Sequence, residues 1–382
     1  MNCVVFTGGG TGGHIFPGLA VAEIFSSKTN YRIYWIGSNG GADKNIVESE
    51  EKISNLKFIS IPAGKLRRYF SLKNFIDIFK TAAGFIKSFF ILLKLKPAFV
   101  FSKGGFVSVP PCAAAKLLKI PVITHECDFS PGLATKLNSK FASHILTSYN
   151  ETINQLSKAV RGKAVCTGNP VRLSFYSADE KKGRDFIKTD SDKPILLVLG
   201  GSLGARQIND LIFDSIEFLA EHFTVVHQTG EKNIEQGKEI SEKLKKSQAA
   251  ELNPSICKNY KPYAFIKNEM PDILKAASII VSRAGANTVW ESAAAGKPMI
   301  LIPLEKGSSR GDQIENAEFF KLNGAAAVLK GDEVSSDNFT KIVKEFLDNP
   351  EKLKKTAEAS GALAKEKPAC IIADFLMKFL DE

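Results

Sequence analysis

The sequence contains few cysteines and no close pair of them. Its 382 residues include six, at positions 3, 112, 127, 166, 257 and 370, and none has Cys-x-x-Cys spacing. That pattern excludes a cysteine zinc site and a dithiol redox motif, and it is typical of a reducing compartment. No set of histidines has metal-ligand spacing either. We therefore expect a cytoplasmic protein with no metal and no cofactor.

The chain also lacks a long uncharged apolar run. The stretch that comes closest, residues 72–95, carries four lysines and an aspartate, whereas a transmembrane helix needs about 20 predominantly apolar residues. The N-terminus reaches a glycine loop at Gly8 without the basic start and longer apolar core of a secretory signal. Hydrophobic residues make up 44% and charged residues 24%. This composition excludes a disordered, collagen-like or polytopic membrane protein.

Short apolar runs alternate with longer amphipathic stretches along the chain. Several of the runs are continuous, as in strands buried on both faces of a parallel sheet. They lie at residues 3–7, 31–36, 98–102, 121–124, 144–147, 194–199, 223–227, 278–282 and 299–303. This order predicts βαβ units. Because a usual domain has about 150 residues, the length of 382 predicts two domains.

We therefore expect an α/β protein with two Rossmann-like domains that face each other across a cleft. Residues 1–172 form the first domain and 173–364 the second, and the polar segment 173–193 is the candidate linker. A C-terminal helix at about 365–382 is expected to pack back on the first domain. Ligands of such sheets bind at the carboxyl ends of the strands.

Glycine-rich loops follow three of the predicted strands. They are Gly8 to Gly13, Gly104–Gly105 and Gly200 to Gly204. Such loops suit phosphates, because glycines let a ligand approach the backbone and a following helix offers N–H groups at its positive end. Their alternative role is a tight turn with no ligand. A dinucleotide site is disfavoured because no acid follows the second strand until Asp43, and a P-loop because His14 replaces its lysine.

Five side chains near these loops are candidates for chemistry, each with a plainer alternative. His14 begins the first helix, where it could accept a proton or only cap and pack. Ser202 could contact a phosphate or cap its helix. Glu291, one turn into a predicted helix, could hold two ribose hydroxyls or simply face solvent. Gln313 and Asn316 are three residues apart and suit sugar hydroxyls, but such amides cap helices just as often.

The basic charge of the chain is concentrated in one segment. Lysine and arginine total 51 and aspartate and glutamate 41, so the net charge is 51 − 41 = +10. Residues 57–103 hold ten basic residues and one acid, which is +9, and leave 41 − 40 = +1 for the remainder. The chain is therefore not generally basic. This distribution disfavours nucleic acid as a partner and favours an anionic membrane surface.

Residues 72–95 predict a helix that lies in a membrane interface. Their lysines recur every seven residues and so form one stripe, since seven residues drift by only about 20° around a helix. Apolar side chains occupy the rest of its girth. The residues expected at the membrane are Arg67, Arg68, Lys73, Phe75, Lys80, Lys87 and Lys94. The alternative is an ordinary core helix with a solvated lysine face.

Five motifs, in order along the chain, together resemble a known family. They are Gly-Gly-Gly-Thr-Gly-Gly-His-Ile-Phe-Pro-Gly-Leu-Ala (8–20), Gly-Gly-Phe-Val-Ser (104–108), Gly-Asn-Pro-Val-Arg (168–172), Gly-Gly-Ser-Leu-Gly-Ala-Arg (200–206) and Ser-Arg-Ala-Gly-Ala-Asn-Thr-Val-Trp-Glu (282–291). The set resembles the MurG family of glycosyltransferases. That family moves N-acetylglucosamine from UDP-N-acetylglucosamine to a lipid-linked muramyl-pentapeptide in peptidoglycan synthesis. The resemblance implies a GT-B fold and a peripheral protein at the cytoplasmic face of the cell membrane.

The resemblance also implies roles for individual residues. His14 matches the family's candidate general base, and Glu291 matches its ribose contact. The residues expected to bind UDP-N-acetylglucosamine are Thr11, Gly12, Gly13, Asp128, Arg172, Ser202, Ile266, Ala286, Asn287, Thr288, Val289, Glu291, Gln313 and Asn316. Phe265 is the alternative to Ile266 at the uracil position. We assign Gly104 and Gly105 to the diphosphate of an undecaprenyl-diphosphate-linked acceptor.

One motif departs from the family pattern. The family usually reads His-Glu-Gln-Asn where this chain has His125-Glu126-Cys127-Asp128. Asp128 keeps an acceptor oxygen but loses the two donors of an amide. Donor affinity or sugar discrimination could therefore differ in this chain.

The resemblance implies an inverting transfer of N-acetylglucosamine to the C4 hydroxyl of the acceptor. Loop N–H groups and helix dipoles would stabilise the departing diphosphate without a metal. A glycolipid glycosyltransferase or a UDP-sugar epimerase of the same fold is the main alternative. A non-catalytic membrane scaffold is a further one, and an oxidoreductase is disfavoured by the missing acid after the second strand.

Overall fold

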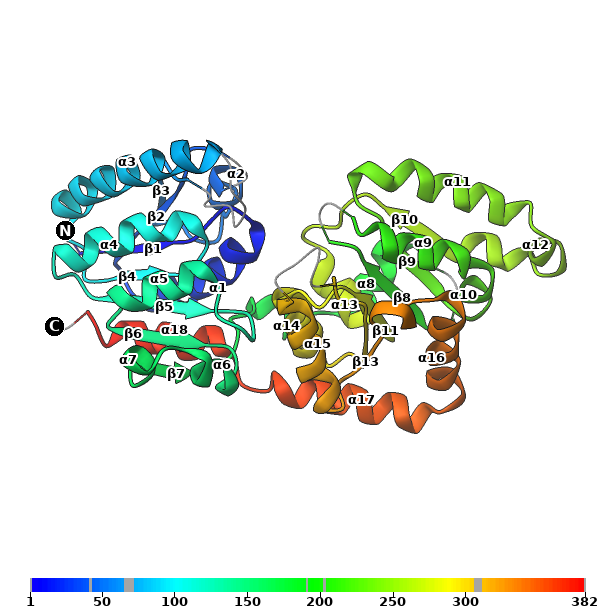
Figure 1. The fold of residues 1–382 in the computed structure, drawn as a ribbon. Helices are drawn as coiled ribbons and strands as arrows, with labels where there is room; N and C mark the ends of the chain where they lie inside the picture. The colour runs from blue at the N-terminus through cyan, green and yellow to red at the C-terminus, as the bar shows by residue number, and fades with distance from the viewer. Residues whose placement is uncertain are drawn as a thin grey trace. The chain divides into compact units, whose positions relative to one another are not determined.

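The computed structural model describes residues 2–40, 43–64, 72–189, 192–201, 204–305 and 311–380, with the backbone alone for 72–75. The chain divides into two compact units. Unit 1 combines Met1–Leu173 with Lys367–Glu382, and unit 2 is Ser174–Glu366. Each unit is built on one sheet of parallel strands flanked by helices (Figure 1).

Unit 1 contains a seven-stranded parallel sheet in the order β3-β2-β1-β4-β5-β6-β7. Its strands are β1 (Cys3–Thr7), β2 (Arg32–Ser38), β3 (Leu56–Ile61), β4 (Val100–Ser102), β5 (Val122–Glu126), β6 (His144–Thr147) and β7 (Ala164–Cys166). Its helices are α1 (Gly12–Lys28), α2 (Asp43–Glu48), α3 (Leu72–Leu95), α4 (Val109–Leu117), α5 (Leu133–Phe141), α6 (Asn150–Gln155), α7 (Lys158–Arg161) and α18 (Pro368–Met377).

Unit 2 contains a six-stranded parallel sheet in the order β10-β9-β8-β11-β12-β13. Its strands are β8 (Ile195–Leu199), β9 (Thr224–Gln228), β10 (Tyr260–Tyr263), β11 (Ile279–Ser282), β12 (Met299–Leu301) and β13 (Ala326–Val328). Its helices are α8 (Glu180–Ile187), α9 (Arg206–Asp214), α10 (Ile216–His222), α11 (Ile234–Lys245), α12 (Gln248–Leu252), α13 (Met270–Ala276), α14 (Ala286–Ala294), α15 (Asp312–Leu322), α16 (Ser336–Asp348) and α17 (Pro350–Leu363).

The cores form where the continuous apolar strands meet the helices. Every residue of β1 and β8 is buried, as the continuous runs predict for strands covered on both faces. In unit 1, α1 and α18 pack on one face of the sheet through side chains such as Phe25 and Ile372. Helices α3 and α4 pack on the other through Leu92 and Cys112. The C-terminal helix α18 thus belongs to the core of the unit that the N-terminus begins.

The strand order reverses beside the first strand of each sheet. Strand β1 lies between β2 and β4, and β8 lies between β9 and β11. In register, Thr7 lies opposite Ser102, and Leu199 lies opposite Ser282. Because these paired parallel strands end at the same level, the loops after β1 and β4 leave the sheet side by side, as do the loops after β8 and β11. In open α/β sheets, ligands bind at such reversal points.

The predicted α/β fold of two Rossmann-like domains is confirmed, but four strands are missing from the prediction. The nine predicted apolar runs correspond to β1, β2, β4, β5, β6, β8, β9, β11 and β12. The missing strands, β3, β7, β10 and β13, are the outermost strands of the two sheets. Most of their side chains are only partly buried, so their sequences need not be continuously apolar.

The prediction that residues 173–193 form a linker is wrong for much of this segment. The units divide between Leu173 and Ser174, and α8 occupies the middle of the segment. Asp179 caps this helix by accepting from the backbone N–H of Lys181 at 2.8 Å. The many charges of α8 suggested a solvated chain, but they lie on the outer face of a helix that packs against α13.

Gly183→Ala tests this packing, because a linker and a packed helix predict opposite signs. A methyl group at Gly183 would lie 2.2 Å from the Asp272 carbonyl oxygen in α13. We expect the variant to lose about 1–3 kcal/mol of stability through overpacking. In an unpacked helix, alanine would instead add up to about 1 kcal/mol. Thermal unfolding decides between them, with the exposed Lys182→Ala as the near-neutral control.

Candidate functional site

In unit 1, the glycine loop after β1 lies directly against the loop after β4. A methyl group at Gly105 would come within 2.3 Å of the Gly9 carbonyl oxygen and 2.9 Å of the His14 ring. Gly104 and Gly105 have φ of 88° and 76°, which L side chains rarely adopt. The structure therefore brings together the first glycine loop, His14 and the loop that was assigned to an acceptor diphosphate.

His14 lies in the first turn of α1 and is partly exposed. Thr11 is the N-cap and is itself exposed, and the first turn has no side-chain cap and no acidic residue. Gly12 and Gly13 are the first two residues of the helix. An anion at this place would meet the positive end of α1. The predicted site residues Thr11 to His14 thus lie together at the start of α1.

Arg172 reaches the same end of α1. Its guanidinium carbon lies 5.3 Å from the centroid of the Phe16 ring. That ring in turn packs on Gly12, where a methyl group would approach it to 2.9 Å. The motif 168–172 follows β7, which is separated from β1 by three strands of the sheet. Guanidinium groups bind phosphate in a bidentate manner, which suits Arg172 to the phosphate contact that the sequence predicted.

Asp43 is a buried loop-bracing residue that the sequence analysis missed. It is 1% exposed, and its carboxylate accepts from the backbone N–H of Gly10 at 2.9 Å and of Ser38 at 3.0 Å. The Ser38 hydroxyl donates to it as well, at 2.9 Å. Asp43 therefore braces the first glycine loop against the end of β2. From the sequence, Asp43 was considered only as an acid, and one too distant for a dinucleotide site. Its bracing role was missed because no sequence motif marks such a brace.

Lys103, His125 and Cys127 form a buried polar cluster between β4 and β5, the second feature that the sequence analysis missed. The Lys103 Nζ lies 2.7 Å from His125 Nδ1 and 2.7 Å from Cys127 Sγ. Burial and the neighbouring Lys103 hold the pKa of His125 well below its usual range. Burial also raises the pKa of the Cys127 thiol to about 11. Both partners of Lys103 are therefore uncharged at neutral pH.

Asp128 follows this cluster and is partly exposed. Its backbone N–H donates to Glu126 Oε1 at 3.0 Å, and the other oxygen of Glu126 accepts from the Gly132 N–H at 2.8 Å. Glu126 is buried and folds the loop after β5 around itself. This loop sets the position of Asp128 in unit 1.

In unit 2, a buried glutamine connects the glycine loop after β8 to Ile266, a predicted donor contact. Gln228 Nε2 donates to the Gly201 carbonyl at 3.4 Å, and its Oε1 accepts from the Ile266 N–H at 2.9 Å. A ligand contact at Ile266 would therefore fall to its carbonyl group. Ser202 lies outside the described residues. Gln228 ends β9 and was not predicted, because nothing in its sequence neighbourhood distinguishes it from a strand residue.

Helix α14 carries the predicted ribose contact. It follows β11 with Gly285 as N-cap and has no side-chain cap and no acid in its first turn. Glu291 and Asn287 are four residues apart, on one face, and both are partly exposed, as is Thr288. Val289 and Ala286 are buried at 0% and 8% exposure. Their side chains anchor the helix, so only their backbone could meet a ligand.

Gln313 and Asn316 hold α15 against the neighbouring loops. Gln313 Oε1 accepts from the Leu304 N–H at 3.0 Å, so a ligand contact would fall to its amino group. Asn316 is fully buried, and its Nδ2 donates to the Ala284 carbonyl at 3.1 Å, just before α14. The amide that was predicted to contact sugar thus fixes the loop between β11 and α14.

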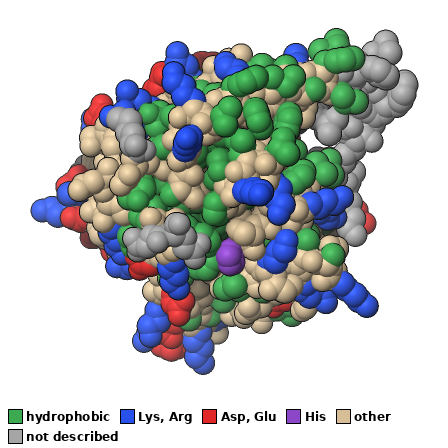
Figure 2. Space-filling model, turned by 90° about the vertical axis from the view of Figure 1, so that its left-hand side faces the viewer, with side chains coloured by type: hydrophobic (Ala, Val, Ile, Leu, Met, Phe, Trp, Pro, Cys, Tyr) green, Lys and Arg blue, Asp and Glu red, His purple; other side chains and the backbone are tan. Residues whose placement is uncertain are grey.

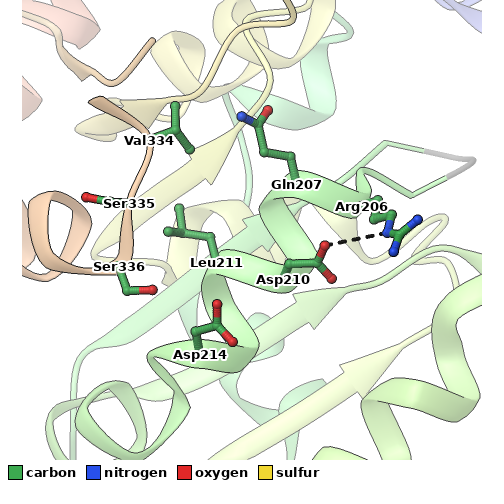
Figure 3. A pocket seen from close by; sticks show the side chains of 8 residues that line it. All are labelled: Arg206, Gln207, Asp210, Leu211, Asp214, Val334, Ser335 and Ser336. Carbon is green, nitrogen blue, oxygen red and sulfur yellow. Dashed lines mark ion pairs between the residues drawn. The ribbon is translucent and has the colours of Figure 1, made fainter. Parts of the chain in front are cut away.

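A separate cavity of about 580 Å³ lies in unit 2 between α9 and the start of α16 (Figure 3). Its lining residues are Arg206, Gln207, Asp210, Leu211, Asp214, Val334, Ser335 and Ser336. Arg206 forms an ion pair with Asp210 at 3.6 Å. None of these residues was predicted to bind the donor, and two aspartates disfavour an anionic ligand. The cavity is not the site that the motifs indicate.

Helix α3 presents apolar side chains to the outside as well as to the core. Its buried side includes Asp77, Ser88 and Leu92. Four apolar side chains on its outer side are 47–70% exposed: Phe79, Ile86, Phe90 and Leu93. We call them the apolar stripe. At about 100° per residue they fall within about 60° of one another, opposite the buried side. Figure 2 shows hydrophobic side chains gathered along the upper edge of the molecule, at the height where α3 lies in Figure 1.

The predicted lysines flank the apolar stripe. Lys80, Lys87 and Lys94, here called the lysine stripe, are all exposed and lie within about 40° of one another. Arg67 and Arg68 lie outside the described residues, as do the side chains of Lys73 and Phe75. No helix in the described ranges is long and apolar enough to cross a membrane. Within the same ranges, no three His, Cys, Asp or Glu side chains are grouped to hold a metal.

Comparisons with known proteins place the chain in a family. Residues 4–147 match the Glycosyltransferase family 28 N-terminal domain, and 195–372 match the Glycosyltransferase family 28 C-terminal domain. The chain is 67% identical to "UDP-N-acetylglucosamine--N-acetylmuramyl-(pentapeptide) pyrophosphoryl-undecaprenol N-acetylglucosamine transferase" of Treponema denticola, over 99% of this chain and 98% of that protein. It is 47% identical to the protein of the same name from Treponema pallidum, over 100% and 96%.

A solved structure shows the same fold. The crystal structure of Acinetobacter baumannii MurG matches with a TM-score of 0.73 and 24% identity, over 99% of this chain and 100% of that one. At that identity the match shows the fold alone, and the family is shown by the full-length relatives. The order of the motifs, the paired glycine loops and these relatives agree. The chain belongs to the MurG family of glycosyltransferases.

Proposed function

We propose that the chain transfers N-acetylglucosamine from UDP-N-acetylglucosamine to a lipid-linked muramyl-pentapeptide, with inversion at the anomeric carbon, in peptidoglycan synthesis. The observation that carries this proposal is the 67% identity to a transferase of that name over nearly the whole of both chains. The placement of glycine loops at both sheet reversals supports it. The relatives of 47–67% identity are named as transferases, which favours transfer over the epimerase and glycolipid alternatives.

Unit 2 supplies most of the donor contacts in this proposal. Glu291 takes the ribose hydroxyls, and Asn287 and Thr288 lie beside it at the start of α14. The carbonyl of Ile266 contacts uracil. Gln313 reaches the transferred sugar with its amino group, and Ser202 contacts the phosphates. Asn316, Ala286 and Val289 support these groups from the core rather than touching the donor through their side chains.

Unit 1 supplies the acceptor side and the base. The loop of Gly104 and Gly105 receives the acceptor diphosphate, and His14 beside it takes the proton of the attacking C4 hydroxyl. As the bond to UDP breaks, negative charge grows on the diphosphate. Thr11, Gly12 and Gly13 at the positive end of α1, together with Arg172, stabilise that charge, and Asp128 contacts the sugar. No metal is required by this scheme.

Helix α3 holds unit 1 to the cytoplasmic face of the membrane in this proposal. An exposed apolar stripe beside an exposed lysine stripe is the arrangement of interfacial helices. The aromatic and aliphatic side chains enter the boundary region, and the lysines meet anionic headgroups. The acceptor is itself a membrane lipid, so such docking would bring Gly104 and Gly105 to the surface where its diphosphate lies.

Transfer itself is tested with labelled UDP-N-acetylglucosamine and lipid-linked acceptor, comparing the wild type with His14→Ala. The wild type should form the disaccharide lipid, and the variant should turn over about 10²–10⁴ times more slowly. Since only an unprotonated imidazole accepts a proton, the variant should also lose the fall in rate at acid pH. The exposed His222→Ala is the control. Equal pH profiles for His14→Ala and wild type would exclude His14 as the base.

Glu291→Gln tests the ribose contact. Loss of hydrogen bonds to a charged group costs about 1.5–3 kcal/mol, so UDP affinity measured by calorimetry should fall roughly ten- to a hundredfold. The variant should also lose the wild-type preference for UDP over 2′-deoxy-UDP. Glu217→Gln, an exposed acid on α10, is the matched control. Unchanged UDP affinity in Glu291→Gln would remove this residue from the donor site.

Vesicle binding tests the role of α3. Replacing Lys80, Lys87 and Lys94 with glutamine should weaken binding to phosphatidylglycerol vesicles by about 3 kcal/mol, or roughly a hundredfold, at about 1 kcal/mol per lysine. Phe79→Ser with Phe90→Ser should weaken it on neutral vesicles too. UDP affinity should not change in either variant. Leu252→Ser, an apolar side chain exposed on α12 of unit 2, controls for simple loss of hydrophobic surface. Full vesicle binding by both variants contradicts this role.

A further inference from the structure

Lys103 is fully buried although it directly follows β4 at the edge of the site. Its exposure is 1%, and its backbone N–H donates to the Thr7 carbonyl at the end of β1, at 2.8 Å. Its aliphatic stem passes two glycines. Methyl groups at Gly8 and Gly18 would come within 3.1 and 3.2 Å of it. The glycine loop and α1 therefore leave a channel through which this side chain runs inward.

The hydrogen bonds at the end of that channel fix the state of His125. Its Nε2 lies 3.0 Å from the Gly168 carbonyl, which can only accept, so Nε2 carries the proton. A neutral imidazole then has its lone pair on Nδ1. Lys103 Nζ, 2.7 Å away, must be the donor to that nitrogen. Lys103 therefore donates to His125, and His125 donates to Gly168.

This chain of bonds, here called the lysine clamp, joins three strand ends. Lys103 belongs to the loop after β4 and immediately precedes Gly104. His125 lies in β5, and Gly168 opens the motif after β7 that ends at Arg172 over the Phe16 ring. In Figure 1 these strands lie in one sheet with β1. The loops after β4, β5 and β7, which lead to Gly104, Asp128 and Arg172, are therefore joined through one buried side chain.

We propose that Lys103 is a positioning residue for the transfer reaction, which holds the loops after β4, β5 and β7 in one frame by fixing the tautomer and orientation of His125. This inference rests on the proposed function. Lys103 itself touches neither donor nor acceptor. The side-chain nitrogen of Lys103 is buried between two uncharged partners. A protein fold alone does not need this arrangement, because apolar residues of similar volume often stabilise such sites.

Lys103→Met separates positioning from stability. Methionine fills the channel without a donor, so we expect an unchanged or higher melting temperature together with a kcat at least about tenfold lower, as small displacements of reacting groups cost up to about a hundredfold. Because unit 2 supplies most of the donor contacts in the proposed function, UDP affinity should fall much less than kcat. Lys116→Met, which removes the same charge from the exposed face of α4, is the matched control and should keep wild-type kcat.

The tautomer of His125 gives a readout that does not require the Lys103→Met variant to fold. In wild-type protein labelled with ¹⁵N-histidine, Nε2 should carry the proton and Nδ1 should show the shift of a hydrogen-bonded acceptor. In Lys103→Met, the Nδ1 signal should move toward that of an unbonded nitrogen. The signals are assigned by their loss in His125→Gln. The reverse tautomer in the wild type would overturn the proposal even if the methionine variant does not fold.

Other outcomes are equally decisive. A kcat within about twofold of wild type in Lys103→Met overturns the proposal, as does a loss of kcat that comes with a large fall in melting temperature. If the wild-type protein transfers no sugar, the proposed function fails. The NMR measurement then still decides whether the lysine clamp exists, so the two failures are distinguishable.

Discussion

The parallel pairing of β1 with β4 and of β8 with β11 is the constraint on which the rest of the site depends. Because each pair ends at the same level, four loops from distant parts of the sequence leave the sheets two by two. The loop of Gly105 then touches that of Gly9. Glycine is required at these contacts for a physical reason, since any side chain there would collide with backbone or with His14. The glycines of these motifs are thus needed for close packing, whatever their role toward a ligand.

Buried polar side chains brace each of these loops from behind. Asp43 holds the loop after β1, Gln228 joins Gly201 to Ile266, and Asn316 fixes the loop before α14. The cluster around Lys103 does the same for the loops after β4 and β5. A loop rich in glycine loses much conformational entropy when it is ordered. At the described residues of these loops, hydrogen bonds to buried groups offset part of that loss.

Helix α3 shows how one element serves two environments. One side joins the core of unit 1 through Leu92, and the opposite side carries the apolar stripe with the lysine stripe next to it. A composition this apolar would make an all-round buried helix in most folds. Here the sheet covers only one side. The excess of basic charge, nine of the ten net charges, lies in the segment that contains this helix.

The sequence by itself determined the central strands, the glycine loops and the family, because buried parallel strands must be continuously apolar and close backbone contacts must be glycine. It missed β3, β7, β10 and β13, whose edge positions leave them half-buried and without a distinct pattern. It also took α8 for a linker. Only the tertiary structure decided which polar residues reach the surface and which brace a loop. Asn316 and Glu291 look alike as helical polar residues, but Asn316 is fully buried against Ala284 and Glu291 is partly exposed. Burial and bonding partners depend on neighbours that are distant in sequence, and these are set by strand order.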